Sequence, residues 1–176
     1  MGKLESGRAI QAARPTSWLG RRDDVRSRVT GRAMQWWPVN IPSMNKSLIT
    51  RSTDAPLDAV CARLPDIAKK HAFGVLGVHD LKEKMNSKGV PFERECRVFE
   101  VCNPQQAQLI LKGDITVSSA LPCRISVYSD GGRTVLATIE PSALLGLFSS
   151  APVGAQAIAA EVRTELVAIM DETCAG

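Results

Sequence analysis

The sequence predicts an α+β protein, a two-layer sandwich in which helices cover one mixed or mainly antiparallel sheet of about five strands. Three observations predict this class. The chain of 176 residues suits one domain with a tail, and strand-like and helix-like segments alternate from Ser47 onward. Two late strand-like runs are joined around Asp130-Gly131-Gly132, which is a strong hairpin signal. A hairpin near the end excludes a purely parallel, doubly wound sheet.

The first 46 residues differ in character from the rest of the chain. They carry nine Lys or Arg and three Asp or Glu, against thirteen and fifteen in the remainder, and they hold all three tryptophans. No helical or strand period is sustained there. We interpret residues 1–46 as a basic, disordered extension and Met44 as the true start of translation. A basic arm for an anionic partner and an organelle targeting peptide are the alternatives, and the acidic residues in the segment count against the second.

Residues 47–174 are predicted to form the single α+β domain. It opens with a strand over Ser47–Ser52, and a helix follows from Pro56, which suits a first helical position. One apolar face at helical spacing comprises Leu57, Val60, Leu64, Ile67 and His71. Pro65 interrupts this helix, so we expect a kink or two short helices.

The middle of the domain continues the alternation. Phe73–Asp80 is a predicted strand, and its two glycines, at positions 74 and 77, indicate a bend or a bulge. A short amphipathic helix then ends at Gly89, and Glu93–Cys102 is the next strand. After the hairpin, Gly154–Thr173 is predicted as the last helix, with one apolar face.

Composition limits the function. Five cysteines, at positions 61, 96, 102, 123 and 174, occur without a Cys-x-x-Cys spacing or a recognisable signal peptide, which favours free thiols in a reducing cytoplasm. With two histidines in the chain, no metal site and no cofactor are predicted. The longest uncharged run, residues 141–160, contains prolines and glycines and so predicts turns and a short helix rather than a membrane span. Beyond residue 46, Asp and Glu outnumber Lys and Arg, so this part of the chain shows no excess of positive charge that would bind nucleic acid.

The candidate site lies where Cys102 precedes Asn103 and Pro104. Asn103 is predicted to cap the helix that follows, with Pro104 at its first position and Ala107, Ile110 and Leu111 facing the sheet. A cysteine beside a helix start can have a lowered pKa, and the free amides there can hold a small anion. The simpler and favoured interpretation is that Cys102 is a small core residue.

Cys123 begins the strand that follows this helix. The connecting segment is long enough to return the chain to its starting end, so we expect Cys102 and Cys123 to lie close together at one end of the sheet. Arg124 could stabilise a thiolate or bind an anionic ligand, yet strand alternation places it on the opposite face from Cys123. An acid–base pair of His79 and Asp80 is rejected because neighbours on a strand do not face each other.

Three stretches, taken in order, resemble the domain of unknown function 302 family: residues 73–85, 99–111 and 121–141. The resemblance covers Ser47 to Thr173, and it implies a compact α+β fold, a homodimer and no established reaction. The residues that match the family pattern are Cys102, Asn103, Pro104 and Cys123. The proline at position 65 departs from the smooth helix that the family would show.

Three functions compete. The preferred one is a binding module for a small anionic or thiol-containing ligand beside the helix start at Cys102-Asn103-Pro104. The second is a thiol-based redox or sulfur-handling protein that uses Cys102 and Cys123, and the third is a structural dimer component. The sequence shows no catalytic constellation and no phosphate-binding loop, so no catalytic residue is named and the question of an enzyme stays open. The expected partners are a second copy and a small molecule, with no nucleic acid and no membrane.

Overall fold

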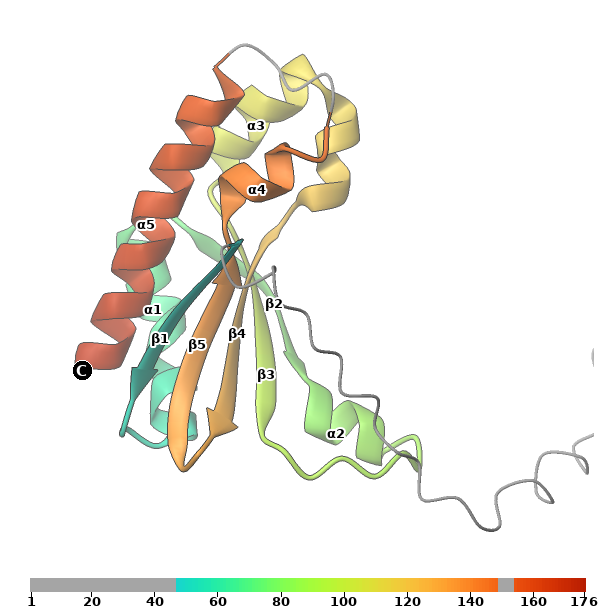
Figure 1. Cartoon of the computed structure of the whole chain (residues 1–176), viewed down its shortest axis with the longest axis vertical. Coiled ribbons are helices and arrows are strands. Elements are labelled where there is room, and N and C mark those ends of the chain that lie inside the picture. The colour runs from blue at the N-terminus through green and yellow to red at the C-terminus, as the bar shows by residue number, and fades with distance from the viewer. Residues whose placement is uncertain (1–46, 149–153) are drawn as a thin grey trace, which may run out of the picture. The chain divides into compact units, whose positions relative to one another are not determined.

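The structure, a computed structural model, describes residues 47–148 and 154–176. The predicted extension over residues 1–46 lies outside the described part. In chain order the elements are β1 (Leu48–Thr53), α1 (Leu57–Lys70), β2 (Gly74–Asp80), α2 (Leu81–Asn86), β3 (Cys96–Cys102), α3 (Pro104–Gly113), the 3₁₀ helix η2 (Ile115–Ala120), β4 (Cys123–Asp130), β5 (Arg133–Ile139), α4 (Pro141–Leu145) and α5 (Ala155–Ala175). This arrangement confirms the predicted α+β sandwich (Figure 1).

The sheet is antiparallel throughout and its strands lie in the order β1-β5-β4-β3-β2. The strands β1 and β2 are therefore its two edges. The predicted hairpin is confirmed as β4 and β5, which Gly131 and Gly132 join with φ angles of +55° and +81°. Glycine reaches this left-handed region without strain, and such turns match the twist of the strands they join.

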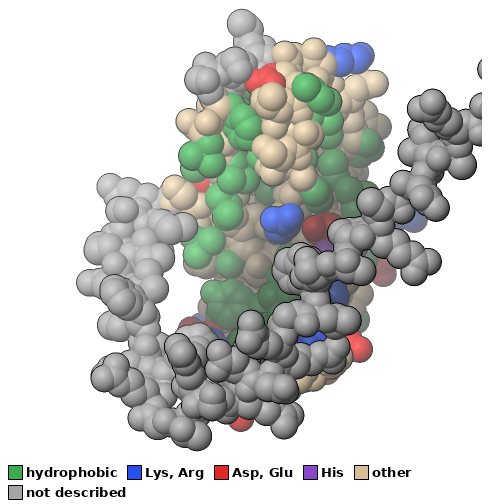
Figure 2. All heavy atoms as spheres, turned by 90° about the vertical axis from the view of Figure 1, so that its right-hand side faces the viewer, with side chains coloured by type: hydrophobic (Ala, Val, Ile, Leu, Met, Phe, Trp, Pro, Cys, Tyr) green, Lys and Arg blue, Asp and Glu red, His purple; other side chains and the backbone are tan. Residues whose placement is uncertain are grey.

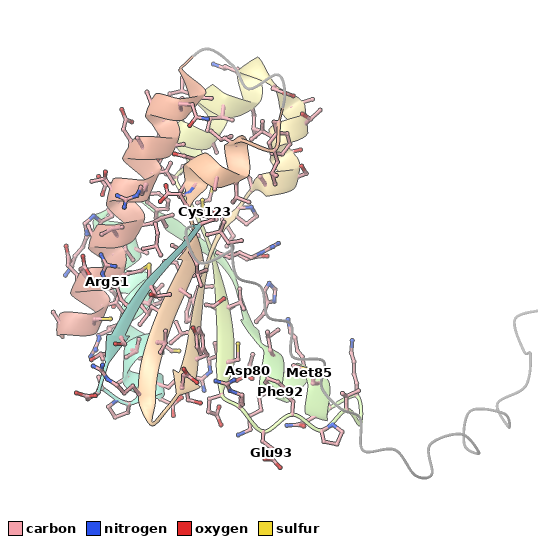
Figure 3. All side chains as sticks on the ribbon, in the orientation of Figure 1. Arg51, Asp80, Met85, Phe92, Glu93 and Cys123 are labelled. Atoms are coloured by element: carbon pink, nitrogen blue, oxygen red, sulfur yellow. The ribbon has the colours of Figure 1, made fainter. Side chains whose placement is uncertain are left out.

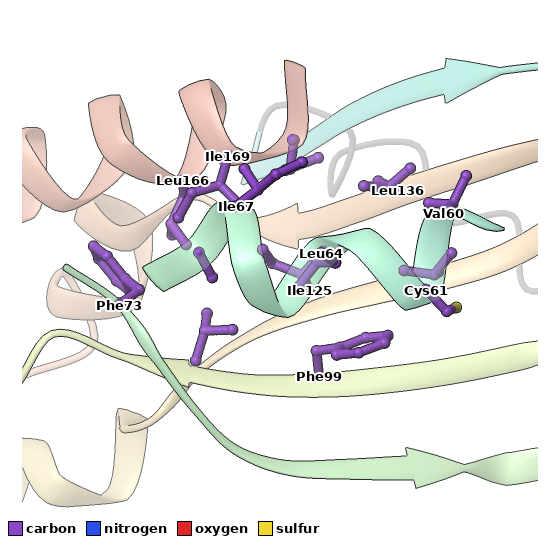
Figure 4. Close-up of a cluster of buried hydrophobic side chains, with 14 of the residues drawn as sticks. Val60, Cys61, Leu64, Ile67, Phe73, Phe99, Ile125, Leu136, Leu166 and Ile169 are labelled. Carbon is purple, nitrogen blue, oxygen red and sulfur yellow. The ribbon is translucent and has the colours of Figure 1, made fainter. Parts of the chain in front are cut away.

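The main core lies between one face of the sheet and the helices α1 and α5. In Figure 4, side chains from both helices converge on strand residues from the centre of the sheet. The largest contributors that are at most 2% exposed are Val60, Leu64, Phe73, Phe99, Val101, Ile125, Val127, Leu136, Leu166, Ile169 and Met170. Burial of these apolar side chains stabilises the two layers against each other.

The sequence predicted a kink or two short helices at Pro65, and the second of these alternatives is wrong. The helix runs without a break from Leu57 to Lys70, with Pro65 inside it. Its end is well defined, because Ala72 has a φ of +58° and the amide of Phe73 donates to the carbonyl of Ala68 at 2.9 Å. This is the hydrogen bond of a Schellman C-terminal motif.

The helices α3 and α4 and the 3₁₀ helix η2 lie beyond one end of the sheet, whereas α2 lies at the opposite end (Figure 1). The side chain of Ile110 therefore packs in a second small core, and the expectation that α3 faces the sheet is wrong. This second core consists of Ile110, Val117, Leu145, Ala155 and Ala159. Across the described ranges, no helix is long and apolar enough to cross a membrane.

His71, directly after α1, contacts α5 through both ring nitrogens. Its Nδ1 lies 2.8 Å from Oε2 of Glu165, and its Nε2 lies 2.8 Å from Oε1 of Glu172. Both contacts can be hydrogen bonds from His71 only when the ring is protonated, because a neutral imidazole has a single N–H donor. The contact with Glu165 is the largest cause that raises the pKa of His71; burial opposes it and Glu172 adds to it.

We expect this contact to make the stability of the protein depend on pH. With a pKa raised in the folded state, the stabilisation is complete below the ordinary histidine pKa of about 6.5 and is lost as the pH rises through the folded-state pKa. Between about pH 6 and about pH 9, the wild-type protein should lose about 1 kcal/mol more free energy of unfolding than His71→Gln. Urea denaturation measures this difference, and equal losses in the two proteins would contradict it.

Candidate functional site

An open groove of about 640 Å³ lies between the start of β2 and the helix α3. Its volume falls in the range of small-molecule sites. The wall is almost wholly apolar and consists of Gly74, Leu76, Cys102, Pro104, Ala107, Gln108, Leu111 and Lys112. Two of the four residues that the sequence singled out, Cys102 and Pro104, therefore line it.

A β-bulge lies in the strand that forms one side of this groove. Val75 pairs with Val101 and Gly77 pairs with Glu100, so Leu76 between them has no partner on β3. The predicted irregularity at the two glycines of β2 is thus confirmed. Leu76 lies two residues after Gly74, so strand alternation places both on the face opposite Val75, which packs against the main core. The side chain of Leu76 is 67% exposed and contributes to the groove instead of to the core.

The start of α3 is capped as predicted. Oδ1 of Asn103 accepts hydrogen bonds from the amides of Gln105 and Gln106 at 3.1 and 3.2 Å, and Pro104 occupies the first turn. The side chain of Asn103 therefore satisfies two of the amides that a small anion would use. This arrangement stabilises the helix and leaves the helix start less suited to hold an anion.

Cys102 and Cys123 lie on neighbouring strands at the same end of the sheet, which confirms their predicted proximity. Cys123 pairs with Val101, the residue before Cys102, in the antiparallel register of β3 and β4. Figure 3 shows Cys123 at the end of the sheet next to α4, far from Asp80 at the other end. Both thiols are free, and with Asn103 they line a cavity of about 20 Å³ behind the groove.

The electrostatics of the two thiols differ from the expectation of an activated cysteine. Burial raises the pKa of Cys102 above its ordinary value, although the thiol lies beside a helix start. Burial also raises the pKa of Cys123 to about 11, with a further contribution from Cys102. Both groups are therefore protonated thiols near neutral pH, and thiolate chemistry is disfavoured there.

A chain of polar side chains crosses three strands, and sequence reasoning missed it. Nζ of Lys84 lies 2.6 Å from Nδ1 of His79, and Nε2 of His79 lies 3.4 Å from Oε1 of Glu100. Nε of Arg124 lies 3.6 Å from the same Glu100 oxygen. Gly77 leaves room for this contact, since a Cβ there would lie 3.3 Å from Glu100 Oε2. Only the pairing of β2 with β3 brings His79 to Glu100, so no local signal could have found it.

Asp80, the rejected partner of His79, has other contacts. Its side chain accepts a hydrogen bond from the amide of Glu83 at the start of α2, and it lies 3.2 Å from Nε of Arg97. The amide of Glu83 is the largest cause that lowers the pKa of Asp80, and Arg97 acts in the same direction. Arg97 also contacts Asp58 of α1 at 2.7 Å and so ties that helix to the sheet. These contacts are structural.

The fold and the groove together define a small α+β sandwich domain: an open antiparallel sheet, two helices on one face and an apolar groove at one end. The chain belongs to the family described as "Domain of unknown function DUF302", which matches residues 49–173. The resemblance that the sequence motifs predicted is thereby confirmed. No specific molecular function is attached to this family.

A solved structure agrees with the assignment. The chain is similar to the "uncharacterized conserved protein DUF302 from Bacillus stearothermophilus", with 31% sequence identity and a TM-score of 0.67. The similarity covers 72% of this chain and 97% of that chain. No curated protein matches the sequence.

Proposed function

We propose that this protein is a binding module and that the groove between β2 and α3 is its binding site. The observation that carries the proposal is Leu76, a large apolar side chain that is 67% exposed and lines the apolar wall. A large exposed leucine costs solvation in the free protein, and a bound apolar ligand would remove that cost. The four residues Cys102, Asn103, Pro104 and Cys123 support the site as wall, helix cap and inner cavity.

The chemistry of the groove favours binding over reaction. The groove is lined by the protonated thiol of Cys102, the amide of Gln108 and the ammonium of Lys112. These lining residues include no acid–base pair. The capped helix start also favours an apolar ligand over the small anion or thiol-containing compound that the sequence predicted. The alternative of a thiol-based redox protein would need a thiolate, which the raised pKa values of Cys102 and Cys123 disfavour.

Filling the groove should abolish binding. The test uses the uncharged, polarity-sensitive dye N-phenyl-naphthylamine and two variants of one helix, Gln108→Trp and Gln105→Trp. Gln108 lines the groove and Gln105 does not, and both are exposed. We expect Gln108→Trp to raise the dissociation constant of the dye at least about tenfold, a loss of roughly 1.4 kcal/mol in binding.

Gln105→Trp is the matched control and should bind the dye as the wild-type protein does. Native mass spectrometry of the purified protein adds a direct search for a retained ligand. The proposal is overturned if the wild-type protein does not bind the dye, or if both tryptophan variants bind it equally well.

We also propose that the protein forms a homodimer in a reducing cytoplasm. Leu48 and Ile139 are paired neighbours, and they are 41% and 48% exposed. Ile49 packs against the main core, so Leu48 points to the opposite face of the sheet, which α1 and α5 leave uncovered. Figure 2 shows hydrophobic side chains on this side of the molecule, together with a group of charged and histidine side chains near its centre. A second copy would cover such a surface, and five free cysteines suit a reducing compartment.

Sedimentation velocity at micromolar concentration tests the dimer. The wild-type protein should sediment as a dimer and Ile139→Lys as a monomer, because a lysine in an apolar interface must lose its hydration. Leu147→Lys is the control, since Leu147 is 79% exposed and lies outside the sheet. A monomeric wild-type protein would rule out the dimer.

A further inference from the structure

The proposed binding site has a wall that selects one chemical class of ligand, so this inference rests on the proposed function. We propose that the groove holds a single-chain amphiphile, a hydrocarbon chain with one anionic head group that contacts Lys112. The anion-binding group is thus placed at the far end of α3 and not at its start.

The groove follows the length of α3. Pro104, Gln108, Leu111 and Lys112 recur at helical spacing and so share one face of the helix. From Pro104 to Lys112 the helix rises roughly 12 Å. Leu76 and Gly74 form the opposite wall from β2. A chain of about ten carbons in extended form would fit along this wall, with one end at Cys102 and the other at Lys112.

The wall favours a hydrocarbon chain over a peptide. Almost no polar atom of the protein faces the groove. A peptide laid there would lose water from its backbone amides and carbonyls without gaining hydrogen bonds, which costs free energy for each group. A hydrocarbon chain has no such groups, and its burial against Leu76 and Leu111 is favourable.

The charge of the groove determines which ligand head group it can bind. Lys112 is the charged residue among the groove-lining side chains. Within the described ranges it forms no ion pair, which is also true of Lys69, Lys70 and Lys88, so its place on the groove wall is what singles it out. An ammonium at the end of an apolar groove complements a single carboxylate or similar anion. One lysine is too little for a membrane surface, which is recognised by clusters of basic residues.

Competition between decanoate and decanol for the dye tests the head group. The two ligands share a chain length and differ in charge. We expect Lys112→Glu to raise the dissociation constant of decanoate about tenfold and Lys112→Gln to raise it about threefold, with decanol unchanged in both variants. Lys88→Glu, a charge reversal at an exposed lysine outside the groove, is the control and should bind both ligands as the wild-type protein does.

A second measurement shows where the hydrocarbon chain of the ligand binds. Decanoate should slow the alkylation of Cys102 by iodoacetamide, as peptide mass spectrometry detects it, and should leave the alkylation of Cys174 unchanged. Cys174 is the matched control because it is also half-buried and free but lies on α5 outside the groove. Protection of both thiols to the same degree would place the ligand elsewhere and overturn the inference.

The outcomes separate this inference from the proposed function. If the dye binds in the groove but decanoate does not displace it, or if Lys112→Glu weakens decanoate and decanol equally, the anionic amphiphile is wrong and the binding module stands. Binding to anionic phosphatidylserine vesicles without binding to free decanoate also overturns it. If the dye itself does not bind, both proposals fail.

Discussion

Phe73→Ala should lower the free energy of unfolding by about 3–5 kcal/mol, the range for removing a buried aromatic ring. The side chain of Phe73 is 2% exposed and belongs to the main core (Figure 4). It follows the Schellman end of α1 directly and also lines the small cavity shared by Cys102 and Cys123. Its loss would leave a void between α1 and the sheet that the surrounding main chain cannot close.

Urea denaturation of Phe73→Ala and of Phe92→Ala measures this effect. Phe92 is the matched control, because it is half-buried in the connection before β3 and is not part of either core. We expect Phe92→Ala to cost about 1 kcal/mol. Similar losses in the two variants would show that the ring of Phe73 does not hold α1 on the sheet.

Pro65→Ala should raise the free energy of unfolding by about 2 kcal/mol. A proline inside a helix removes one backbone hydrogen bond, crowds the carbonyl four residues before it and costs about 3 kcal/mol. The gain from removing it is reduced by about 1 kcal/mol, because alanine gives the unfolded chain more freedom. Pro65 lies in the interior of α1, four residues after Cys61, so the full effect applies.

Pro56→Ala is the control for this substitution. Pro56 precedes the first residue of α1, where a backbone N–H has no helical partner to lose. This variant should be neutral or slightly destabilising in the same urea titration. If Pro65→Ala is no more stable than the wild-type protein, the proline is required for the path that α1 follows over the sheet.

Features that depend on a few neighbouring residues could be predicted from the sequence. Asn103 and Pro104 define a helix start because cap and first turn interact within three residues. Gly131 and Gly132 define the hairpin because only their φ angles allow so tight a turn. The proximity of Cys102 and Cys123 could also be predicted, because the lengths of the segments between them are sufficient to return the chain to the end of the sheet from which it started.

Pro65 shows where local reasoning was wrong. The local cost of a proline predicts a kink or two short helices, and the second alternative is wrong because α1 continues through Pro65. The apolar face of α1 buries Val60, Leu64 and Ile67 against the sheet and α5. Burial of each such side chain contributes about 1.5–3 kcal/mol, and their sum exceeds the cost of one lost hydrogen bond.

The sequence by itself determined the family, the α+β class, the order of the elements and the position of Cys102 beside a helix start. Only the tertiary structure decided the chemistry of that position. Whether a thiol is activated depends on its burial, and burial depends on residues distant in the chain. The groove likewise needs Leu76 of β2 and the placement of α3 beyond the sheet, because its two walls come from segments that only folding brings together.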